Sequence, residues 1–223
     1  GTARQIQKKY SMTAGAGKTT QLISDIVNLV NQGYQLQNMM IMSFSRTTVR
    51  EVEERLRAKL NHFSHLDWQQ ETRYIRTQHS ISWGYIRNDF TLITWREKKQ
   101  FQEEYGWKLN SWNDTSDDDP YTAFMKNDGD SVDESVWKAI NLGRLTCQDP
   151  KNLLEYPREA PIMERLLRDY TEWRNKNNYI DFIGMIEEAV TREATPTNIT
   201  HIFVDEAQDM CPLLYEYHKI LYH

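Results

Sequence analysis

The chain has little of what would tie it to disulfide chemistry or to a membrane. Only two of its 223 residues are cysteines, Cys147 and Cys211, which is too few for a disulfide framework and suits a reducing compartment. The sequence begins with no recognisable signal peptide, and its longest apolar stretches fall far short of the ~18 residues that span a bilayer. We therefore expect a cytoplasmic protein with no membrane partner.

Glycine is also scarce, with nine residues in the chain, yet two of them stand in one short string, A-G-A-G-K-T-T. Its backbone N–H groups can wrap phosphate oxygens, while Lys18 can reach the β and γ phosphates and Thr19 can bind magnesium. Met12 stands where the usual pattern has its first glycine, so a flexible turn that opens a helix is the alternative. The candidate nucleotide-binding residues are Ala14, Gly15, Ala16, Gly17, Lys18, Thr19 and Thr20.

A second string, V-D-E-A-Q-D over residues 204–209, follows an apolar run that is typical of a buried strand. Asp205 and Glu206 would then emerge at the C-terminal end of that strand, where α/β sheets hold ligands. One carboxylate can hold magnesium through water while its neighbour orients the attacking water. An acidic helix start before Pro212 is the alternative. Together with the glycine-rich string, however, the pattern favours a magnesium-nucleotide site with ATP and Mg²⁺ as cofactors.

Charge is divided unevenly along the chain. Residues 1–100 carry a net +7 and residues 101–223 a net −12. This asymmetry is what a polyanion-binding face beside an acidic, solvated remainder would give, and solvated helix faces are the alternative.

His62 and His65 are close enough for a metal pair, but no cysteine or carboxylate cluster completes it, so we assign no zinc.

Periodicity predicts alternating strands and helices in the first third of the chain. Apolar residues at helical spacing follow the glycine-rich string, and Gly33 stands where a C-terminal cap belongs. The expected strands are 7–13, 38–44, 74–77 and 200–204, and the expected helices include 47–60, 78–86 and 181–190. Such alternation implies an α/β fold with a parallel sheet.

The segment between residues 88 and 180 has a different character, with no strand alternation. Residues 153–173 have helical spacing, and 114–120 form an acidic run that we expect to be a loop. Core packing is the favoured role for its five tryptophans, and binding platforms are the alternative; these are Trp95, Trp107, Trp112, Trp137 and Trp173. We predict two parts of an ATPase domain, 1–88 and 181–223, separated by a helical insertion at 89–180.

In their residues and in their order along the chain, these motifs resemble those of superfamily 1 helicases of the UvrD/Rep/PcrA type. The phosphate loop of that family typically contains A-G-x-G-K-T, as at 14–19, and its second nucleotide motif contains D-E-x-Q-D, as at 205–209. Residues 43–48 resemble the family segment T-F-T-N-K-A-A, 77–80 resemble T-F-H-S, and 181–186 resemble D-F-x-x-L-L. The resemblance implies a RecA-like P-loop NTPase fold with an inserted helical domain.

By the same resemblance, Lys18 and Thr19 would bind the phosphates and magnesium, Asp205 the metal, and Glu206 would activate water. Gln208 would couple the γ-phosphate to the rest of the motor. The residues expected to line a single-stranded DNA path are Phe44, Ser45, Arg46, Thr77, His79 and Ser80. Aromatic, basic and hydroxyl groups suit such a path, since stacking is worth about 1–3 kcal/mol per base. Phe44 as a core residue and His79 as a helix cap are the alternatives.

The resemblance implies an ATP-hydrolysing DNA helicase, with the family's second RecA-like domain as a missing partner in the same full-length protein. We expect a fragment that turns over ATP barely at all, because losing the arginines of that domain costs ~10³ to 10⁵ in rate. An ATPase subunit of a helicase–nuclease or repair complex, and a non-catalytic nucleotide- or DNA-binding regulator, are the alternatives. Glu206→Gln in the full-length protein separates the catalytic from the regulatory alternative.

Overall fold

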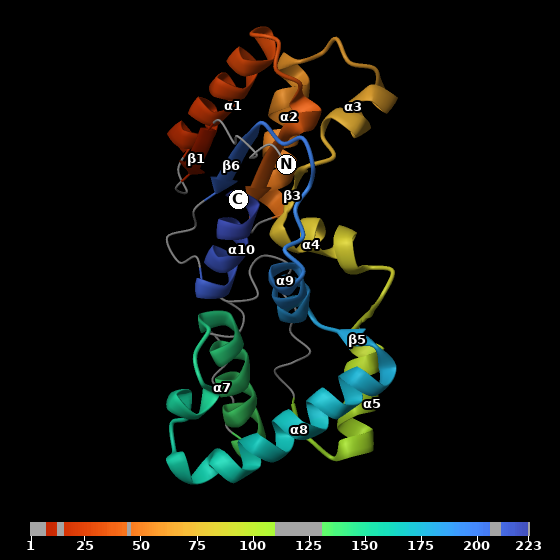
Figure 1. The fold of residues 1–223 in the computed structure, drawn as a ribbon, viewed down its shortest axis with the longest axis vertical. Coiled ribbons are helices and arrows are strands. Elements are labelled where there is room, and N and C mark those ends of the chain that lie inside the picture. The colour runs from red at the N-terminus through yellow and green to blue at the C-terminus, as the bar shows by residue number, and fades with distance from the viewer. Residues whose placement is uncertain (1–7, 13–15, 44–45, 110–130, 206–210, 223) are drawn as a thin grey trace. The chain divides into compact units, whose positions relative to one another are not determined.

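The computed structural model describes residues 8–12, 16–43, 46–109, 131–205 and 211–222. At 8–12, 16–18, 66, 205 and 222 it describes the backbone alone. The chain divides into two compact units (Figure 1): unit 1 is 1–81, 194–210 and 219–223, and unit 2 is 82–193 and 211–218. The domain boundaries expected after residues 88 and 180 stay a prediction. In the described ranges, no helix is long and apolar enough to cross a membrane.

Unit 1 contains a four-stranded parallel sheet whose strands follow the order β1-β6-β2-β3 (Figure 1). The strands are β1 (Lys8–Met12), β2 (Met39–Ser43), β3 (Ile75–Thr77) and β6 (His201–Asp205). Every residue of β2 is buried, as expected for a strand inside a parallel sheet covered by helices. All four strands were expected from the sequence, and the mixed α/β class and the parallel pairing are confirmed.

The first two helices of unit 1 begin and end close to where periodicity predicts, and they are α1 (Ala16–Asn31) and α2 (Arg46–Lys59). The unit also contains α3 (His65–Glu71), which the sequence analysis did not predict, and a 3₁₀ turn at Leu36–Asn38. The predicted cap of α1 is confirmed, because Gly33 has φ +102° and its N–H donates to the carbonyl of Val30 at 3.0 Å. The core of this unit is mainly aliphatic, with Trp68 and Phe203 as its buried aromatic side chains.

Two helices, α4 (Gln78–Ile86) and α10 (Pro212–Tyr222), contribute residues to both units. The helix expected at 78–86 is confirmed. Residues 206–210, which hold most of the acidic string, lie outside the described residues, so the helix start proposed for that string is tested only from Pro212 onward.

Unit 2 is mostly helical, as expected. Its helices are α5 (Trp95–Tyr105), α7 (Val132–Thr146), α8 (Ala160–Asn177) and α9 (Phe182–Thr191). The sequence shows no strand alternation here, yet β4 (Thr91–Leu92) pairs in parallel with β5 (Tyr179–Ile180). Strands of two residues are too short for an alternation pattern to be seen in the sequence.

The helix expected at 153–173 starts later than predicted. Two 3₁₀ turns, Pro150–Leu153 and Pro157–Glu159, precede α8, which then extends to Asn177. Pro150 and Pro157 each begin one of these turns, and Pro161 stands in the first turn of α8. Proline lacks the N–H needed inside a helix, so such clusters fit at helix starts.

The tryptophans of this segment divide into core and surface. Trp107, Trp137 and Trp173 are buried in one aromatic cluster, so the core prediction is confirmed for them. For Trp95 it was wrong, because that side chain is 65% exposed. Trp112 and the acidic run 114–120 lie outside the described residues. Residue type alone could not separate these cases, since an aromatic ring suits both a core and a binding face.

A charged network is buried beside the aromatic cluster. The Arg144 guanidinium donates to both carboxylate oxygens of Asp181, at 2.6 and 2.8 Å, and also pairs with Glu187. The Tyr170 hydroxyl donates to Asp181, which in turn caps α9 by accepting from the Gly184 N–H. Burial would raise the pKa of Asp181, but the charge and hydrogen bonds of Arg144 outweigh it and hold that pKa well below its ordinary value.

Candidate functional site

The two nucleotide strings leave the sheet from neighbouring strands. β1 and β6 run parallel side by side, and Met12, the last residue of β1, lies opposite Asp205, the last residue of β6. The glycine-rich string follows Met12 directly, and Glu206 follows Asp205. Because the ends of parallel strands meet at one edge of a sheet, strings separated by most of the chain begin next to each other at the backbone level.

The glycine-rich string continues into α1, whose first residue is Ala16. Ala14 and Gly15 lie outside the described residues, and the backbone of Gly17 and Lys18 is already helical. A 16-residue helix therefore starts four residues beyond the end of β1. The N-terminus of such a helix carries unpaired N–H groups and a partial positive charge, which is a suitable environment for phosphate.

Thr20 in the first turn of α1 has a partner that sequence reasoning missed. Its Oγ1 accepts a hydrogen bond of 2.9 Å from the Arg55 guanidinium of α2. Arg55 also lies 3.6 Å from Glu51, one turn earlier in the same helix, and its side chain is 34% exposed. In the sequence this arginine looks like half of an ordinary surface pair at i, i+4 spacing. Only the packing of α2 beside α1 brings it to the glycine-rich string.

The candidate DNA residues follow the other two strands of the same sheet. Ser43, which ends β2, lies opposite Thr77, which ends β3. Arg46 begins α2 and is exposed, whereas Phe44 and Ser45 lie outside the described residues. The strand order therefore separates one sheet edge into two halves, with the nucleotide strings after β1 and β6 and the candidate DNA segments after β2 and β3.

Local hydrogen bonds fix the start of α4. Thr77 Oγ1 accepts from the Ser80 N–H at 3.3 Å, so the Thr77 hydroxyl caps this helix. Arg76 donates to Ser80 Oγ at 3.2 Å and to the Arg73 carbonyl at 2.8 Å. His79 and Ser80 are half-buried. Roles for Thr77, His79 and Ser80 at nucleic acid stay predictions, and Arg76 is a neighbouring cation that the sequence had not indicated.

The side chains expected to do the chemistry are only partly described. Thr19 is half-buried in the first turn of α1, and Asp205 is described as backbone. Glu206 and Gln208 lie outside the described residues, as does the side chain of Lys18. No group of three or more His, Cys, Asp or Glu side chains that could hold a metal ion occurs among the residues that the structure does describe.

Comparisons with known proteins identify the family of this chain. The family model of the UvrD/REP helicase N-terminal domain matches residues 10–223. A curated relative from Ligilactobacillus salivarius, which is one of the subunits of an ATP-dependent helicase/nuclease, is 23% identical over 197 residues, covering 87% of this chain. The chain spans 14% of the length of that relative. Since the family match covers nearly the whole sequence, this chain belongs to the UvrD/REP helicase N-terminal domain family.

Proposed function

We propose that this chain is a RecA-like motor domain that binds ATP and Mg²⁺ at the β1–β6 end of its sheet and couples hydrolysis to movement on single-stranded DNA. The observation that carries the proposal is the pairing of β1 with β6, with Met12 opposite Asp205. This register starts a phosphate-binding string and a metal-binding string side by side. One shared magnesium-nucleotide site requires that proximity.

The residue types at this edge fit a nucleotide with its metal. Backbone N–H groups of residues 14–18 suit the phosphate oxygens, and Lys18 suits the β and γ phosphates. Thr19 and Asp205 would hold magnesium, which when bound neutralises charge on the phosphates. Glu206 would take the proton of the attacking water, and Gln208 would sense the γ-phosphate. Arg55 would hold the Thr20 hydroxyl in place and add positive charge beside the first turn of α1.

The DNA path would follow the ends of β2 and β3 on the same edge. Phe44 would stack on a base, and Ser45 and Arg46 would contact the backbone. Thr77, His79 and Ser80 would continue the path, supported by Arg76. Because β6 pairs with β2, the nucleotide half and the DNA half meet at this pair of strands. A change in the position of β6 on hydrolysis would therefore be transmitted directly to the DNA segments.

One observation favours a second form of this function. The relative from Ligilactobacillus salivarius is named as part of a helicase/nuclease. By analogy, this chain would supply the motor portion of a complex that also cleaves DNA. The remaining alternative, a regulator without catalysis, differs from both in not needing Glu206.

The nucleotide site is tested by measuring equilibrium binding of ATP to this chain with and without Mg²⁺. Lys18→Ala removes a charge-assisted contact worth about 1.5–3 kcal/mol, so the affinity should fall by about 10- to 150-fold. Glu206→Gln should leave binding intact, because its carboxylate acts on water rather than on phosphate. Arg55→Gln should weaken binding less than Lys18→Ala does.

Arg57→Gln is the matched control for Arg55→Gln. It removes the same charge from the same helix, but Arg57 lies 3.3 Å from the ring of His65 rather than beside Thr20. If the two substitutions weaken ATP binding equally, the effect of Arg55 is one of general positive charge, and Arg55 is not part of the site. ATP binding that is independent of both Lys18 and Mg²⁺ would overturn the proposed function.

A further inference from the structure

One tryptophan of unit 2 is exposed at a place where the backbone is well fixed. Trp95 begins α5 and is 65% exposed, whereas Trp107, Trp137 and Trp173 of the same unit are at most 5% exposed. The start of α5 is held by a capping box, in which the Thr94 N–H donates to the Glu97 carboxylate at 2.8 Å. The exposure of Trp95 therefore does not come from a frayed helix end.

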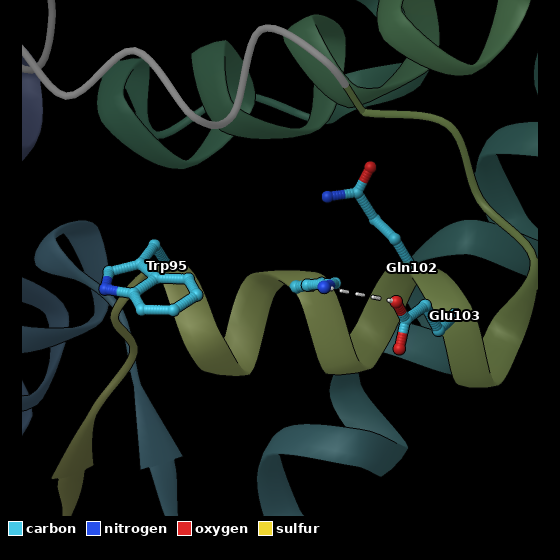
Figure 2. Close-up of a pocket in the computed structure, with 4 residues that line it drawn as sticks. Trp95, Gln102 and Glu103 are labelled. Carbon is cyan, nitrogen blue, oxygen red and sulfur yellow. Dashed lines mark ion pairs between the residues drawn. The ribbon is translucent and has the colours of Figure 1, made fainter.

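Trp95 lines a hollow on the surface of unit 2. The hollow has a volume of about 460 Å³ and is lined by Trp95, Lys99, Gln102 and Glu103 (Figure 2). These positions fall on one face of α5, since residues three and four apart are neighbours on a helix. The volume lies within the range of about 300–1,000 Å³ that is usual for small-ligand sites. An exposed indole beside such a hollow can stack on a planar ring.

The charges around the indole suit a polyanion more than a neutral ligand. The Arg96 guanidinium lies 5.4 Å from the centre of the Trp95 ring. Lys99 and Glu103 are 3.9 Å apart and both 68% exposed, so their pairing is weak and Lys99 can turn to a phosphate at little cost. The Glu97 carboxylate is engaged with Thr94, and the positive end of α5 lies at Trp95.

Two polar side chains lie further along the hollow. The Gln102 side chain is already committed, because its Oε1 accepts from the Leu109 N–H at 2.9 Å. Glu103 stands about 12 Å beyond Trp95 along the helix axis, so its carboxylate lies too far away to contact a base that is stacked on the indole. The face thus combines a stacking ring with cations for phosphate.

We propose that the Trp95 face of α5 is a binding site for one base of single-stranded DNA, separate from the path along the sheet edge. The proposal rests on the proposed function, because it assumes that this chain acts on DNA. Trp95 stacks on the base, and Arg96 and Lys99 contact the adjoining phosphates. A nucleic acid accounts for both the exposed ring and its flanking cations.

The test uses the whole chain without nucleotide and measures fluorescence anisotropy of labelled oligodeoxycytidylate and oligothymidylate of about 12 nucleotides. Trp95→Ala should weaken binding by about 5- to 150-fold, the range for loss of one stacked base, and Trp95→Phe should retain most of the affinity. Lys99→Gln should lower the slope of log affinity against log salt by about 0.7, since one phosphate contact is lost.

Tyr156→Ala is the matched control. Tyr156 is also an exposed aromatic residue of unit 2, and the Arg158 guanidinium lies 4.8 Å from its ring centre, but it does not line the hollow. Its substitution should leave oligonucleotide binding unchanged. If Trp95→Ala and Tyr156→Ala bind the oligonucleotides with equal affinity, the proposal is overturned, and contact with a protein partner becomes the better explanation of the exposed ring.

The outcomes also separate this proposal from the proposed function. If ATP binding depends on Lys18 but Trp95→Ala binds DNA as the wild type does, only the Trp95 site fails. If the wild-type chain binds neither ATP nor either oligonucleotide, the proposed function fails and the Trp95 site with it.

Discussion

The two units are stabilised by different kinds of interaction. The core of unit 1 is mainly aliphatic and surrounds a parallel sheet, whereas the core of unit 2 is an aromatic cluster beside a buried arginine–carboxylate network. In that cluster the ring centres of Phe101 and Trp173 are 4.9 Å apart, and Trp137 meets Tyr170 edge to face, also at 4.9 Å. Unit 2 therefore depends more on directed side-chain contacts.

The difference follows from how each unit sets its register. In unit 1 the main-chain hydrogen bonds of adjacent strands determine which residues lie opposite each other, and apolar side chains need only fill space. Among the described residues of unit 2, the short β4–β5 pair is the only such ladder. Aromatic geometry and bidentate ion pairs then determine how α7, α8 and α9 meet.

The largest expected effect is on the buried network of unit 2. Arg144→Met leaves Asp181, whose side chain is 13% exposed, without its ion-pair partner, and an uncompensated buried charge costs about 3–5 kcal/mol. Glu187 is 39% exposed and adds little to this loss. The free energy of unfolding in urea measures this. Lys151→Met is the control, because it breaks an exposed pair with Glu164 at 2.8 Å and should leave stability unchanged. Similar losses in the two variants would contradict a special role for the buried pair.

The pH dependence of stability should follow from the same network. Because the pKa of Asp181 is lower in the folded chain than its ordinary value of about 3.9, its stabilisation is present above that pH and is lost as the pH falls further. Urea unfolding from neutral pH to about pH 3 should show this loss in the wild type. Asp181→Asn, which keeps a capping side chain, should be less stable at neutral pH and lose less on acidification. Parallel pH profiles for the two proteins would contradict the assignment.

A smaller effect is expected at Gly184 in α9. An added Cβ there would lie 2.8 Å from Ile180 Cγ1 and 3.0 Å from Asp181 Oδ1, so Gly184→Ala should cost about 1–3 kcal/mol through overpacking. Gly84 in α4 has open space around its Cα, so Gly84→Ala should stabilise by up to about 1 kcal/mol through helix propensity. Thermal unfolding compares the two variants. Equal shifts would mean that crowding at Gly184 is relieved by local movement.

The smallest effect is expected in the aliphatic core of unit 1. Ile41 lies at the centre of β2 and is 2% exposed, so Ile41→Val should cost about 0.5–1.5 kcal/mol. The sheet register should persist, because the main-chain pairing of β2 with β3 and β6 does not involve this methyl group. A loss as large as that for Arg144→Met would remove the contrast between the two cores.

Much of unit 1 could be predicted from the sequence because its signals are local. Periodicity located α1, α2 and α4, Gly33 marked the end of α1, and alternation of elements indicated a parallel sheet. The strand order could not be read in this way, since β6 enters between β1 and β2 from the far end of the chain. That insertion puts the two nucleotide strings on neighbouring strands.

What the sequence could not show depends on contacts between distant residues. Arg55 reaches Thr20 across two helices, and the Arg144–Asp181 network joins α7 to the start of α9. Nothing in the local pattern around either arginine distinguishes it from a solvated surface charge. The exposure of Trp95 could not be predicted either, because an aromatic residue near a helix start fits a core or a surface equally well.

The Met12–Asp205 pairing has a consequence for how this architecture can vary. Because strand register sets where the two strings begin, the length of chain between them has no influence on the distance between their starting points, and the intervening chain can grow, shrink or be exchanged without altering this end of the sheet. Slippage of β1 by a single residue would move its end by about 3.3 Å, roughly the length of one hydrogen bond. The length of the chain between β1 and β6 is thus free to vary in evolution and in protein engineering, whereas the register of these two five-residue strands is not.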